Sequence, residues 1–410
     1  MLKNIKASLI IKTIFDYLQR KLRFHIIKYN NELKKAINVE LKDYKEYKSL
    51  KEFKKKYFLN QEDDANSLTL DLKFHGIENK GLKYFNIIEF HYLKELNLSK
   101  NNITDITLLE IAKLKKLEIL NLSNNKIKDI TPLSKVSFKD LKALNLSYDG
   151  INDIKSLTDF NFLKLEKLDL NNNKITDIQP LSQCNFVNLK SLILSFNNIT
   201  DINSLERVNF QKLEVLELNS NKISDINILS QVNFKELKEL NLSLNKICDI
   251  KILEKVNFEN LENLILNFNK ISDINILENV NFKKLKELHL YHNNISDINV
   301  LRKVNFKELI KLNLSGNKIS DINALGMASF EKLEMLRLND NYISDISAIG
   351  VFKELNELSL YNNRITNLNL FEKVKFDNLS TLIINKNPID KKSELFIIED
   401  LKSQLEIFNI

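Results

Sequence analysis

Three polar side chains that lie close together in the sequence, Glu287, His289 and His292, are the strongest candidates for metal chemistry. Carboxylate and imidazole groups are common zinc ligands, and Glu287 and His289 would share one face of a strand because side chains alternate along it. A metal site needs a third or fourth ligand, but the equivalent positions in the flanking segments hold Ile265, Asn267, Asn313 and Ser315. We therefore predict no metal site and interpret the cluster as a polar patch on a binding surface.

No other residue pattern predicts catalysis or a cofactor. The 410 residues include only 6 Gly and 2 Cys, and no phosphate-binding loop, nucleophile elbow or metalloprotease helix motif occurs. Cys184 and Cys248 are expected to lie several strands apart, beyond the roughly 7 Å between Cα atoms that a disulfide spans. We predict two free thiols, and a protein that is not an enzyme and has no catalytic residues, cofactors or metals.

An aspartate recurs at a fixed interval along most of the chain. Such a series would suggest calcium, but each interval supplies a single Asp followed by Ile, whereas calcium takes about six to eight oxygen ligands. We interpret each Asp as a short acceptor that caps free N–H groups of the next turn. The series is Asp105, Asp129, Asp153, Asp177, Asp201, Asp225, Asp249, Asp273, Asp297, Asp321 and Asp345, with Asn367 in the next position.

A repeat of 24 residues determines the elements that position these side chains. Thirteen units each open with a leucine, 24 residues apart except for one interval of 22. The opening leucines are Leu93, Leu117, Leu141, Leu165, Leu189, Leu213, Leu237, Leu261, Leu285, Leu309, Leu333, Leu355 and Leu379. The units follow the pattern L-x-x-L-x-L-x-x-N-x-I-x-D-I-x-x-L, and a degenerate unit at residues 68–72 precedes them.

This pattern resembles the leucine-rich repeat family, in particular the leucine-rich-repeat regulatory subunit of protein phosphatase 1 and the bacterial internalins. The resemblance covers about residues 66–390. It implies an α/β solenoid, a right-handed superhelix with a parallel β-sheet on its concave face and short 3₁₀ or irregular turns on its convex face. The residues support this independently, because Leu240 and Leu242 alternate with Asn241 and Ser243 as in a strand with one buried face. Such short strands bury their apolar face only by stacking on neighbouring units.

Two further series are predicted to be structural. An asparagine after each strand is expected to serve backbone groups where the chain turns, and a phenylalanine is expected to stack on its neighbours in a buried spine. The first series is Asn101, Asn125, Asn173, Asn197, Asn221, Asn245, Asn269, Asn293, Asn317, Asn341, Asn363 and Asn387, with Asp149 in the third unit. The second is Phe138, Phe162, Phe186, Phe210, Phe234, Phe258, Phe282, Phe306, Phe330 and Phe376, and we expect the 22-residue unit to lack this Phe.

One column of side chains after the strands differs from the small polar residues around it. It contains Tyr148, Phe196, Leu244, Phe268 and His292, with His289 and Tyr291 alongside. Exposed aromatic groups gathered on a curved sheet are typical of a protein-binding site. We predict that these residues bind a partner protein on the concave face; the alternative is that they pack against neighbouring loops.

Both ends of the chain are predicted to be helical. Residues 1–63 are expected to form a helical region, either a cap over the first unit or a module that resembles an F-box and docks on a Skp-type adaptor through residues 6–50. The faint F-box resemblance rests on Ile14–Leu18 and Ile27–Asn30. Residues 64–389 are expected to form the solenoid of about 13 repeats, and residues 390–410 a helical C-terminal cap with its helix at about 391–403.

Basic charge is concentrated at the N-terminal end. Residues 1–60 carry 16 Lys/Arg and 6 Asp/Glu, a net charge of +10, whereas the other 350 residues carry 45 and 48, a net charge of −3. We interpret the basic segment as a solvated helix surface and expect no nucleic-acid partner. No apolar run is long enough to span a membrane. Free cysteines, and glycosylation sequons on the expected concave face, favour a cytoplasmic location.

The sequence therefore favours a non-enzymatic protein–protein interaction scaffold that binds a partner protein on its concave face. One alternative is a substrate receptor of a cullin ubiquitin ligase that uses residues 6–50 as its adaptor-binding module. A second is a phosphatase-regulatory leucine-rich-repeat subunit, which rests on the repeat type alone. A third is a bacterial effector or surface protein, which we expect less because no secretion signal or anchor motif is apparent.

Overall fold

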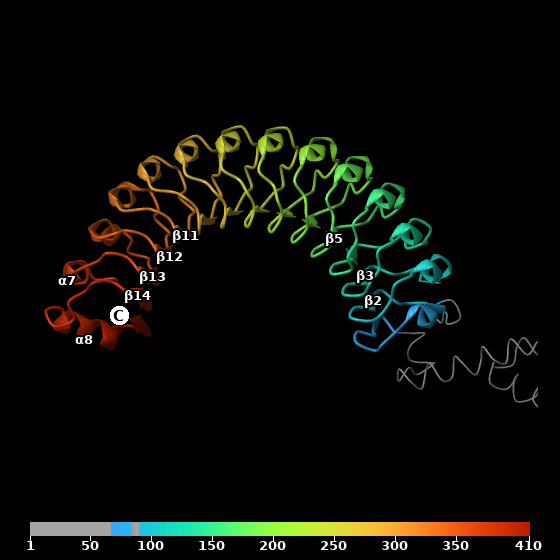
Figure 1. Ribbon diagram of the computed structural model, residues 1–410, viewed down its shortest axis with the longest axis horizontal. Coiled ribbons are helices and arrows are strands. Elements are labelled where there is room, and N and C mark those ends of the chain that lie inside the picture. Colours follow the sequence, from blue (N-terminus) through green and yellow to red (C-terminus); the bar gives the residue numbers. More distant parts are fainter. Residues whose placement is uncertain (1–66, 84, 86–89, 113) are drawn as a thin grey trace, which may run out of the picture. The chain divides into compact units, whose positions relative to one another are not determined.

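The computed structural model describes residues 67–83, 85, 90–112 and 114–410. Residues 68–410 belong to one compact unit. Its strands line the inner side of an arc and its short helical turns line the outer side (Figure 1). The helical region predicted for residues 1–63, including the adaptor-binding module at residues 6–50, lies outside the described residues.

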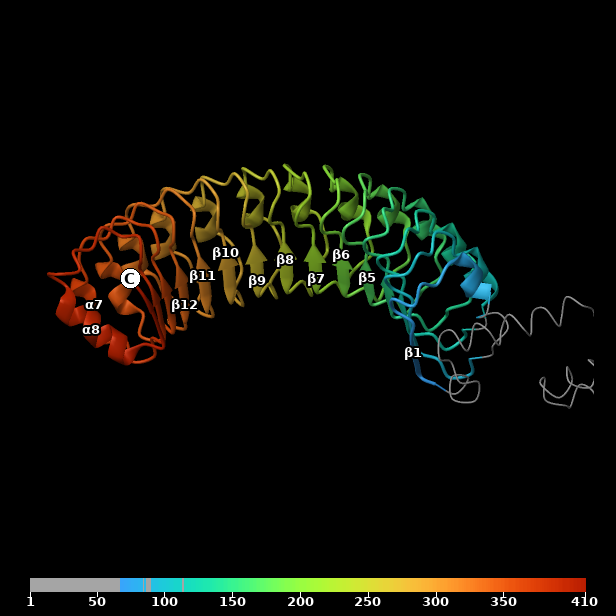
Figure 2. The same ribbon diagram turned by 60° about the horizontal axis from the view of Figure 1, so that its bottom comes forward.

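The strands of the described residues form one parallel sheet in which each strand pairs with the next unit along the chain (Figure 2). Each strand has three residues, and in β1 to β14 the central residue is buried while its two neighbours face the concave side. The register is constant, so Leu240 of β8 pairs with Leu216 of β7 and Leu264 of β9. The strands are β1 Thr69–Asp71, β2 Glu95–Asn97, β3 Ile119–Asn121, β4 Ala143–Asn145, β5 Lys167–Asp169, β6 Ser191–Ile193, β7 Val215–Glu217, β8 Glu239–Asn241, β9 Asn263–Ile265, β10 Glu287–His289, β11 Lys311–Asn313, β12 Met335–Arg337, β13 Glu357–Ser359, β14 Thr381–Ile383 and β15 Ile407–Asn409.

Short 3₁₀ helices form the convex side, as the repeat pattern predicts. They are η2 Asn79–Lys83, η3 Thr107–Ile111, η4 Thr131–Ser134, η5 Lys155–Asp159, η6 Gln179–Gln183, η7 Asn203–Arg207, η8 Asn227–Ser230, η9 Lys251–Glu254, η10 Asn275–Glu278, η11 Asn299–Arg302, η12 Asn323–Met327 and η13 Ser347–Val351. The equivalent turn of the next unit is a short α-helix, α7 (Asn369–Lys373). No helix within the described ranges is long and apolar enough to cross a membrane.

The repeated aspartates cap these turns. Asp201 Oδ1 accepts a hydrogen bond of 2.7 Å from the N–H of Asn203, the first residue of η7. Asp249 does the same for Lys251, at 2.8 Å. Within the described part of the chain, no group of three or more His, Cys, Asp or Glu side chains is placed to hold a metal ion. The interpretation of this series as caps is confirmed.

The repeated asparagines form the predicted buried ladder. The amide nitrogen of Asn245 donates to the carbonyl oxygens of Leu218 at 3.0 Å, Leu242 at 3.1 Å and Ser243 at 3.1 Å. Its Oδ1 accepts from the N–H of Ile223 at 2.9 Å. Each asparagine thus ties the turn of its own unit to the unit before it, and this links the repeats in series.

Replacing Asn245 by Ala is expected to lower the free energy of unfolding by about 1–3 kcal/mol, because buried backbone groups lose their partners. Urea unfolding followed by circular dichroism measures the change. Asn227, an exposed residue at the start of η8, provides the control, and Asn227→Ala is expected to change stability by no more than about 0.5 kcal/mol. Equal stability of the two variants would show that the ladder is not important for stability.

The phenylalanine spine is buried, with one correction. The nine residues from Phe138 to Phe330 are at most 3% exposed. The expectation that the 22-residue unit lacks this residue is wrong, because Phe352 stacks on Phe330 with ring centroids 6.3 Å apart and an interplanar angle of 18°. The two residues absent from this unit are missing between η13 and Phe352, so Phe352 keeps its place three residues before Leu355. Phe376, at the C-terminal end of the series, is only half-buried.

The C-terminal end contains the predicted helix and an additional strand. Helix α8 spans Leu395–Gln404, and its residues Ile398 and Leu401 are buried. Strand β15 follows and pairs in parallel with β14, so the sheet extends one strand beyond the thirteen repeats. Both cysteines are free, as predicted, and burial raises the pKa of the Cys184 thiol to about 12.

Candidate functional site

Every strand is followed by a short segment that leads the chain out of the sheet at the carboxyl ends of the strands. The third residue after the strand defines what we call the edge column. Its N–H continues the ladder between units: Phe268 donates to Tyr291 O at 2.7 Å, and His292 donates to Ser315 O at 2.9 Å. The described edge column consists of Phe74, Lys100, Asn124, Tyr148, Asn172, Phe196, Ser220, Leu244, Phe268, His292, Gly316, Asp340, Asn362 and Lys386.

All residues of the edge column have a left-handed backbone, with φ of +51° at Phe268 and +53° at Phe196. This conformation costs about 1–2 kcal/mol for most L-residues and is easiest for Gly, Asn and Asp. Asn172, Asn362 and Gly316 suit it, whereas the bulky side chains of the column do not. Because Asn, Asp or Gly would satisfy the backbone better, the fold does not account for the bulky residues.

The bulky residues of the edge column are exposed to solvent. Tyr148 and Phe196 are each 49% exposed, Leu244 is 45% and Phe268 is 41% exposed. Phe268 also packs against Tyr291 and His292 of the next unit, so it combines solvent exposure with contacts to a neighbouring loop, as the predicted alternative describes. The units that carry these bulky residues therefore present a large apolar side chain beside the concave face.

Three of the predicted site residues form one aromatic cluster. The ring of Phe268 lies 4.9 Å from Tyr291 in an edge-to-face arrangement and 4.7 Å from His292. The centroids of Tyr291 and His292 are 4.4 Å apart. A Cβ atom built on Gly316 would lie 2.9 Å from His292 Nδ1, so the imidazole rests directly on the backbone of the next unit. We call Phe268, Tyr291 and His292 the aromatic cluster.

The other predicted residues lie near this cluster or farther along the same column. Leu244 belongs to the preceding unit, whereas Phe196 and Tyr148 are separated from it by the small polar residues at 220 and 172. His289 lies on β10, where its Nε2 is 3.1 Å from Glu287 Oε2. Glu287 also pairs with Lys311 at 2.8 Å. Of the sequence cluster, Glu287 therefore contacts both His289 and Lys311 on the sheet, whereas His292 belongs to the aromatic cluster.

The opposite edge of the sheet carries charges that neutralise one another. The residue before each of the strands β2 to β10 alternates between Lys and Glu from one unit to the next, in the order Lys94, Glu118, Lys142, Glu166, Lys190, Glu214, Lys238, Glu262 and Lys286. Each glutamate of this lysine–glutamate ladder lies within 2.8 Å of a lysine. Hydrogen bonds from Lys142 and Lys94 lower the pKa of Glu118 to about 2.

The sequence analysis did not single out the concave carboxylates Asp169, Glu217 and Glu239. Among the described residues none of the three forms an ion pair, and Glu217 accepts only a long hydrogen bond of 3.3 Å from Ser195 Oγ. Burial raises the pKa of Asp169, and burial followed by repulsion from Glu239 raises the pKa of Glu217. These three carboxylates could have been found from the sequence. Each is an acidic residue next to a buried strand leucine, and residues at that position face the concave side.

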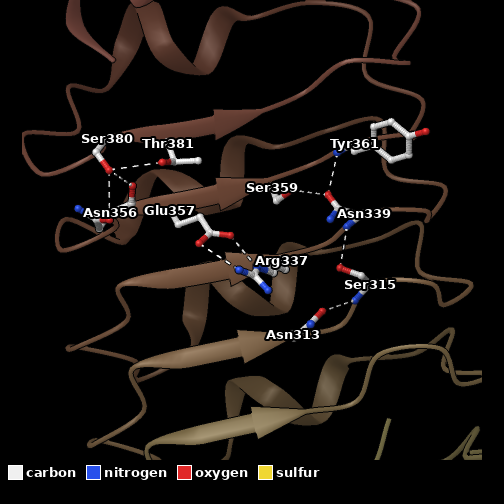
Figure 3. A network of polar contacts seen from close by, with 10 residues as sticks. All are labelled: Asn313, Ser315, Arg337, Asn339, Asn356, Glu357, Ser359, Tyr361, Ser380 and Thr381. Atoms are coloured by element: carbon white, nitrogen blue, oxygen red, sulfur yellow. Dashed lines mark hydrogen bonds and ion pairs between the residues drawn. The ribbon is translucent and has the colours of Figure 1, made fainter. Parts of the chain in front are cut away.

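In the C-terminal part of the concave face, polar side chains of neighbouring strands pair with one another (Figure 3). Arg337 of β12 forms a two-pronged ion pair with Glu357 of β13, with distances of 2.6 and 3.2 Å. Asn339 accepts hydrogen bonds from Ser359 Oγ at 2.6 Å and from Tyr361 N at 2.9 Å. Glu357, the strand carboxylate at this end of the sheet, thus has an ionic partner among the described residues, unlike Asp169, Glu217 and Glu239 of the central strands.

The comparisons with known proteins agree with this architecture. Residues 93–135, 163–207, 187–231, 259–303 and 307–350 match the family described as Leucine Rich repeats (2 copies). The internalin InlF of Listeria monocytogenes is 30% identical with a TM-score of 0.65, over 81% of this chain and 88% of that one. A leucine-rich repeat protein of Leptospira interrogans is 25% identical with a TM-score of 0.65, over 85% of this chain and 97% of that one. No curated protein matches the chain in sequence.

The architecture is that of a repeat scaffold: a curved solenoid with one regular parallel sheet and a column of mostly exposed side chains along its edge. The chain belongs to the leucine-rich repeat proteins. This fold commonly mediates protein–protein interactions, and the relatives that share it are typically non-enzymatic scaffolds. A further similar structure is that of PEPR1–AtPEP1, at 26% identity and a TM-score of 0.57, over 80% of this chain and 46% of that one.

Proposed function

We propose that this protein is a non-enzymatic scaffold that binds a partner protein along its concave face, anchored by the bulky residues of the edge column. The observation that carries this proposal is the aromatic cluster, in which the exposed rings of Phe268 and His292 occupy left-handed backbone positions that favour Gly, Asn or Asp, and both contact the half-buried ring of Tyr291. Strained backbone conformations and exposed aromatic groups both concentrate at binding sites. The structure of PEPR1–AtPEP1 supports the proposal, because it is a similar solenoid whose structure is described as that of PEPR1 together with AtPEP1.

Replacing Phe268 by Asn is expected to separate binding from folding. Asn occupies the same column position in other units, at 124, 172 and 362, so unfolding free energy should stay within about 1 kcal/mol of wild type. Loss of an aromatic anchor costs about 2 kcal/mol, so partner binding is expected to weaken by roughly thirtyfold. Tyr291→Ala is expected to have an effect of the same size.

The partner for this measurement is the most abundant protein that the full chain retains from its native cells, identified by mass spectrometry and then purified. Isothermal titration calorimetry gives the Kd for each variant. Lys303→Ala is the control, because Lys303 lies just after η11 on the convex side and pairs with Glu278 at 2.9 Å. Unchanged binding by a folded Phe268→Asn, Tyr291→Ala double variant would place the site elsewhere.

The narrower functions remain predictions. The ubiquitin-ligase receptor depends on residues 6–50, which lie outside the described residues, and the phosphatase-regulatory subunit rests on repeat type. A Skp-type adaptor that co-purifies with the full chain, but not after deletion of residues 1–60, would support the first. The cytoplasmic location also remains a prediction.

A further inference from the structure

The central part of the concave face combines apolar side chains with carboxylates. The last residues of β5 to β9 pair in one row, Asp169, Ile193, Glu217, Asn241 and Ile265. The first residues of the same strands form a second row that contains Val215 and Glu239. These side chains are half-buried. The bulky residues of the edge column, from Phe196 to Phe268, flank this part of the sheet.

We propose that the partner segment seated on this face is an extended, cationic peptide segment, with a Lys or Arg close in sequence to an apolar side chain that contacts the edge column. The inference rests on the proposed function and specifies the chemistry of its partner. The apolar side chain packs against Phe268 and Leu244, and the cation reaches Glu217, while Asp169, two strands farther along, adds negative charge to the same row.

Charge complementarity is the reason for choosing a cationic occupant. Glutamates of the lysine–glutamate ladder have lysine partners within 2.8 Å, and Glu287 and Glu357 are paired as well. Asp169, Glu217 and Glu239 form no ion pair in the described part of the chain. Lys167 lies near enough to favour ionisation of Asp169 and Glu217, but it does not pair with either. Asp71 and Glu95, at the N-terminal end of the described sheet, also form no ion pair with a described residue, but they are exposed, whereas the three central carboxylates are half-buried.

Desolvation of these carboxylates points the same way. Burial is the largest cause of the raised pKa of both Asp169 and Glu217, so their charges are held in a poorly hydrated place. A cation from a partner lowers the energy of such a charge more than that of a fully hydrated one. The free protein bears this cost, and a bound Lys or Arg would remove it.

The strand spacing sets the expected distance between the two anchors. Glu217 belongs to β7 and Phe268 follows β9, two strands away along the stacking direction. At about 4.8 Å per strand this is about 10 Å, which an extended peptide covers in about three residues. The cation is therefore expected about three to four residues from the apolar anchor.

The test uses a phage-displayed library of random 12-residue peptides, selected on the full chain. Selected peptides are expected to contain Lys or Arg about three to four residues from Phe, Tyr, Leu or Met, at about twice the frequency of the unselected library. The best peptide is then synthesised. Its affinity is expected to fall about tenfold for the double variant Asp169→Asn, Glu217→Gln, and also at high salt.

A matched double variant controls for net charge. Glu166→Gln with Glu214→Gln also removes two negative charges, but from the lysine–glutamate ladder, where both are paired. Affinity for the peptide is expected to change by less than about twofold. Equal losses in the two double variants, or selected peptides without Lys or Arg, would overturn the cationic-segment proposal.

The two proposals fail in different ways. Peptides that lose affinity for Phe268→Asn but not for Asp169→Asn, Glu217→Gln leave the proposed function standing and refute only the cationic partner. Peptides that bind Phe268→Asn as tightly as wild type contradict the proposed site itself. Recovery of no binding peptide at all would contradict an extended segment as the occupant.

Discussion

Replacing Asp149 by Asn is expected to raise the free energy of unfolding at pH 8 by about 2–4 kcal/mol. Asp149 is the one acidic member of the buried asparagine ladder in the described units, and it is 4% exposed. Its Oδ1 accepts from the N–H groups of Asn125 at 2.9 Å and Ile127 at 3.3 Å. Its Oδ2 is buried and has no hydrogen-bond partner among the described residues.

The missing donor explains this effect. At the next position of the ladder, the amide nitrogen of Asn173 donates to three carbonyl oxygens, those of residues 146, 170 and 171. An ionised carboxylate has no hydrogen to donate there, whereas a protonated one has a single O–H. Burial is the main cause that raises the pKa of Asp149 from 3.8 to about 7, against the two N–H groups that lower it.

The pH dependence follows from the direction of this shift. The folded state keeps a proton that the unfolded chain releases above about pH 4, so the stability due to Asp149 is complete below pH 3.8 and falls as the pH rises to about 7. A shift of about three units corresponds to about 4 kcal/mol at most. An asparagine at position 149 does not titrate and supplies the amide donor at every pH. The loss of stability between about pH 4 and pH 7 should therefore be absent in Asp149→Asn.

Urea unfolding at pH 5 and pH 8 measures the effect. The pKa values of Asp169 and Glu217 are also raised, so these groups also make the protein less stable as the pH rises. The effect of Asp149 is therefore the difference in pH dependence between wild type and variant. Asp153→Asn is the matched control. Asp153 lies in the same unit, is exposed and caps Lys155 N at 2.8 Å, a role that Asn also performs. A pH dependence that is the same in wild type and Asp149→Asn would refute a protonated Asp149.

Replacing Phe234 by Ala is expected to lower the free energy of unfolding by about 3–5 kcal/mol, because it opens a cavity in the spine. Phe234 is 1% exposed and lies in the middle of the series, with buried spine residues in the units on both sides. The solenoid can close such a gap only by moving neighbouring units. Urea unfolding and the thermal midpoint provide the measurement.

Two further variants show whether burial in the spine is the cause. Phe352→Ala is expected to cost about as much as Phe234→Ala, since Phe352 is 3% exposed and stacks on Phe330. Phe376→Ala removes the same atoms from a half-buried site and is expected to cost about 1–2 kcal/mol. Three equal losses, or none, would contradict a spine whose contribution depends on burial.

The repeat made the architecture predictable from the sequence. Because each unit meets a nearly identical unit on either side, one correct assignment of strand, asparagine and aspartate positions applies to all of them. The roles of Asn245 and Asp201 are local consequences of that assignment, and both are confirmed by the hydrogen bonds. The prediction for Phe352 was wrong because a fixed spacing was applied across the deletion, whereas the shortened segment lies before that residue.

The candidate site was only partly predictable. The column of bulky residues is visible in the sequence, since Phe196 and Phe268 stand where other units have small polar residues. That their backbone is left-handed, and that Phe268, Tyr291 and His292 touch, depends on how the chain leaves the sheet between adjacent units. Sequence spacing carries no information on that geometry.

The repeat, the parallel sheet, the ladder and the spine follow from the amino-acid sequence alone, because they need only apolar periodicity and one polar residue at a fixed place in each unit. Which charges are neutralised became visible only in the folded chain. Glu214 and Glu217 are three residues apart, yet the first pairs with Lys238 at 2.7 Å and the second has no ionic partner among the described residues. Whether a carboxylate meets a lysine depends on side chains about 24 residues away in the next unit and on the burial around them, and stacking alone brings those together.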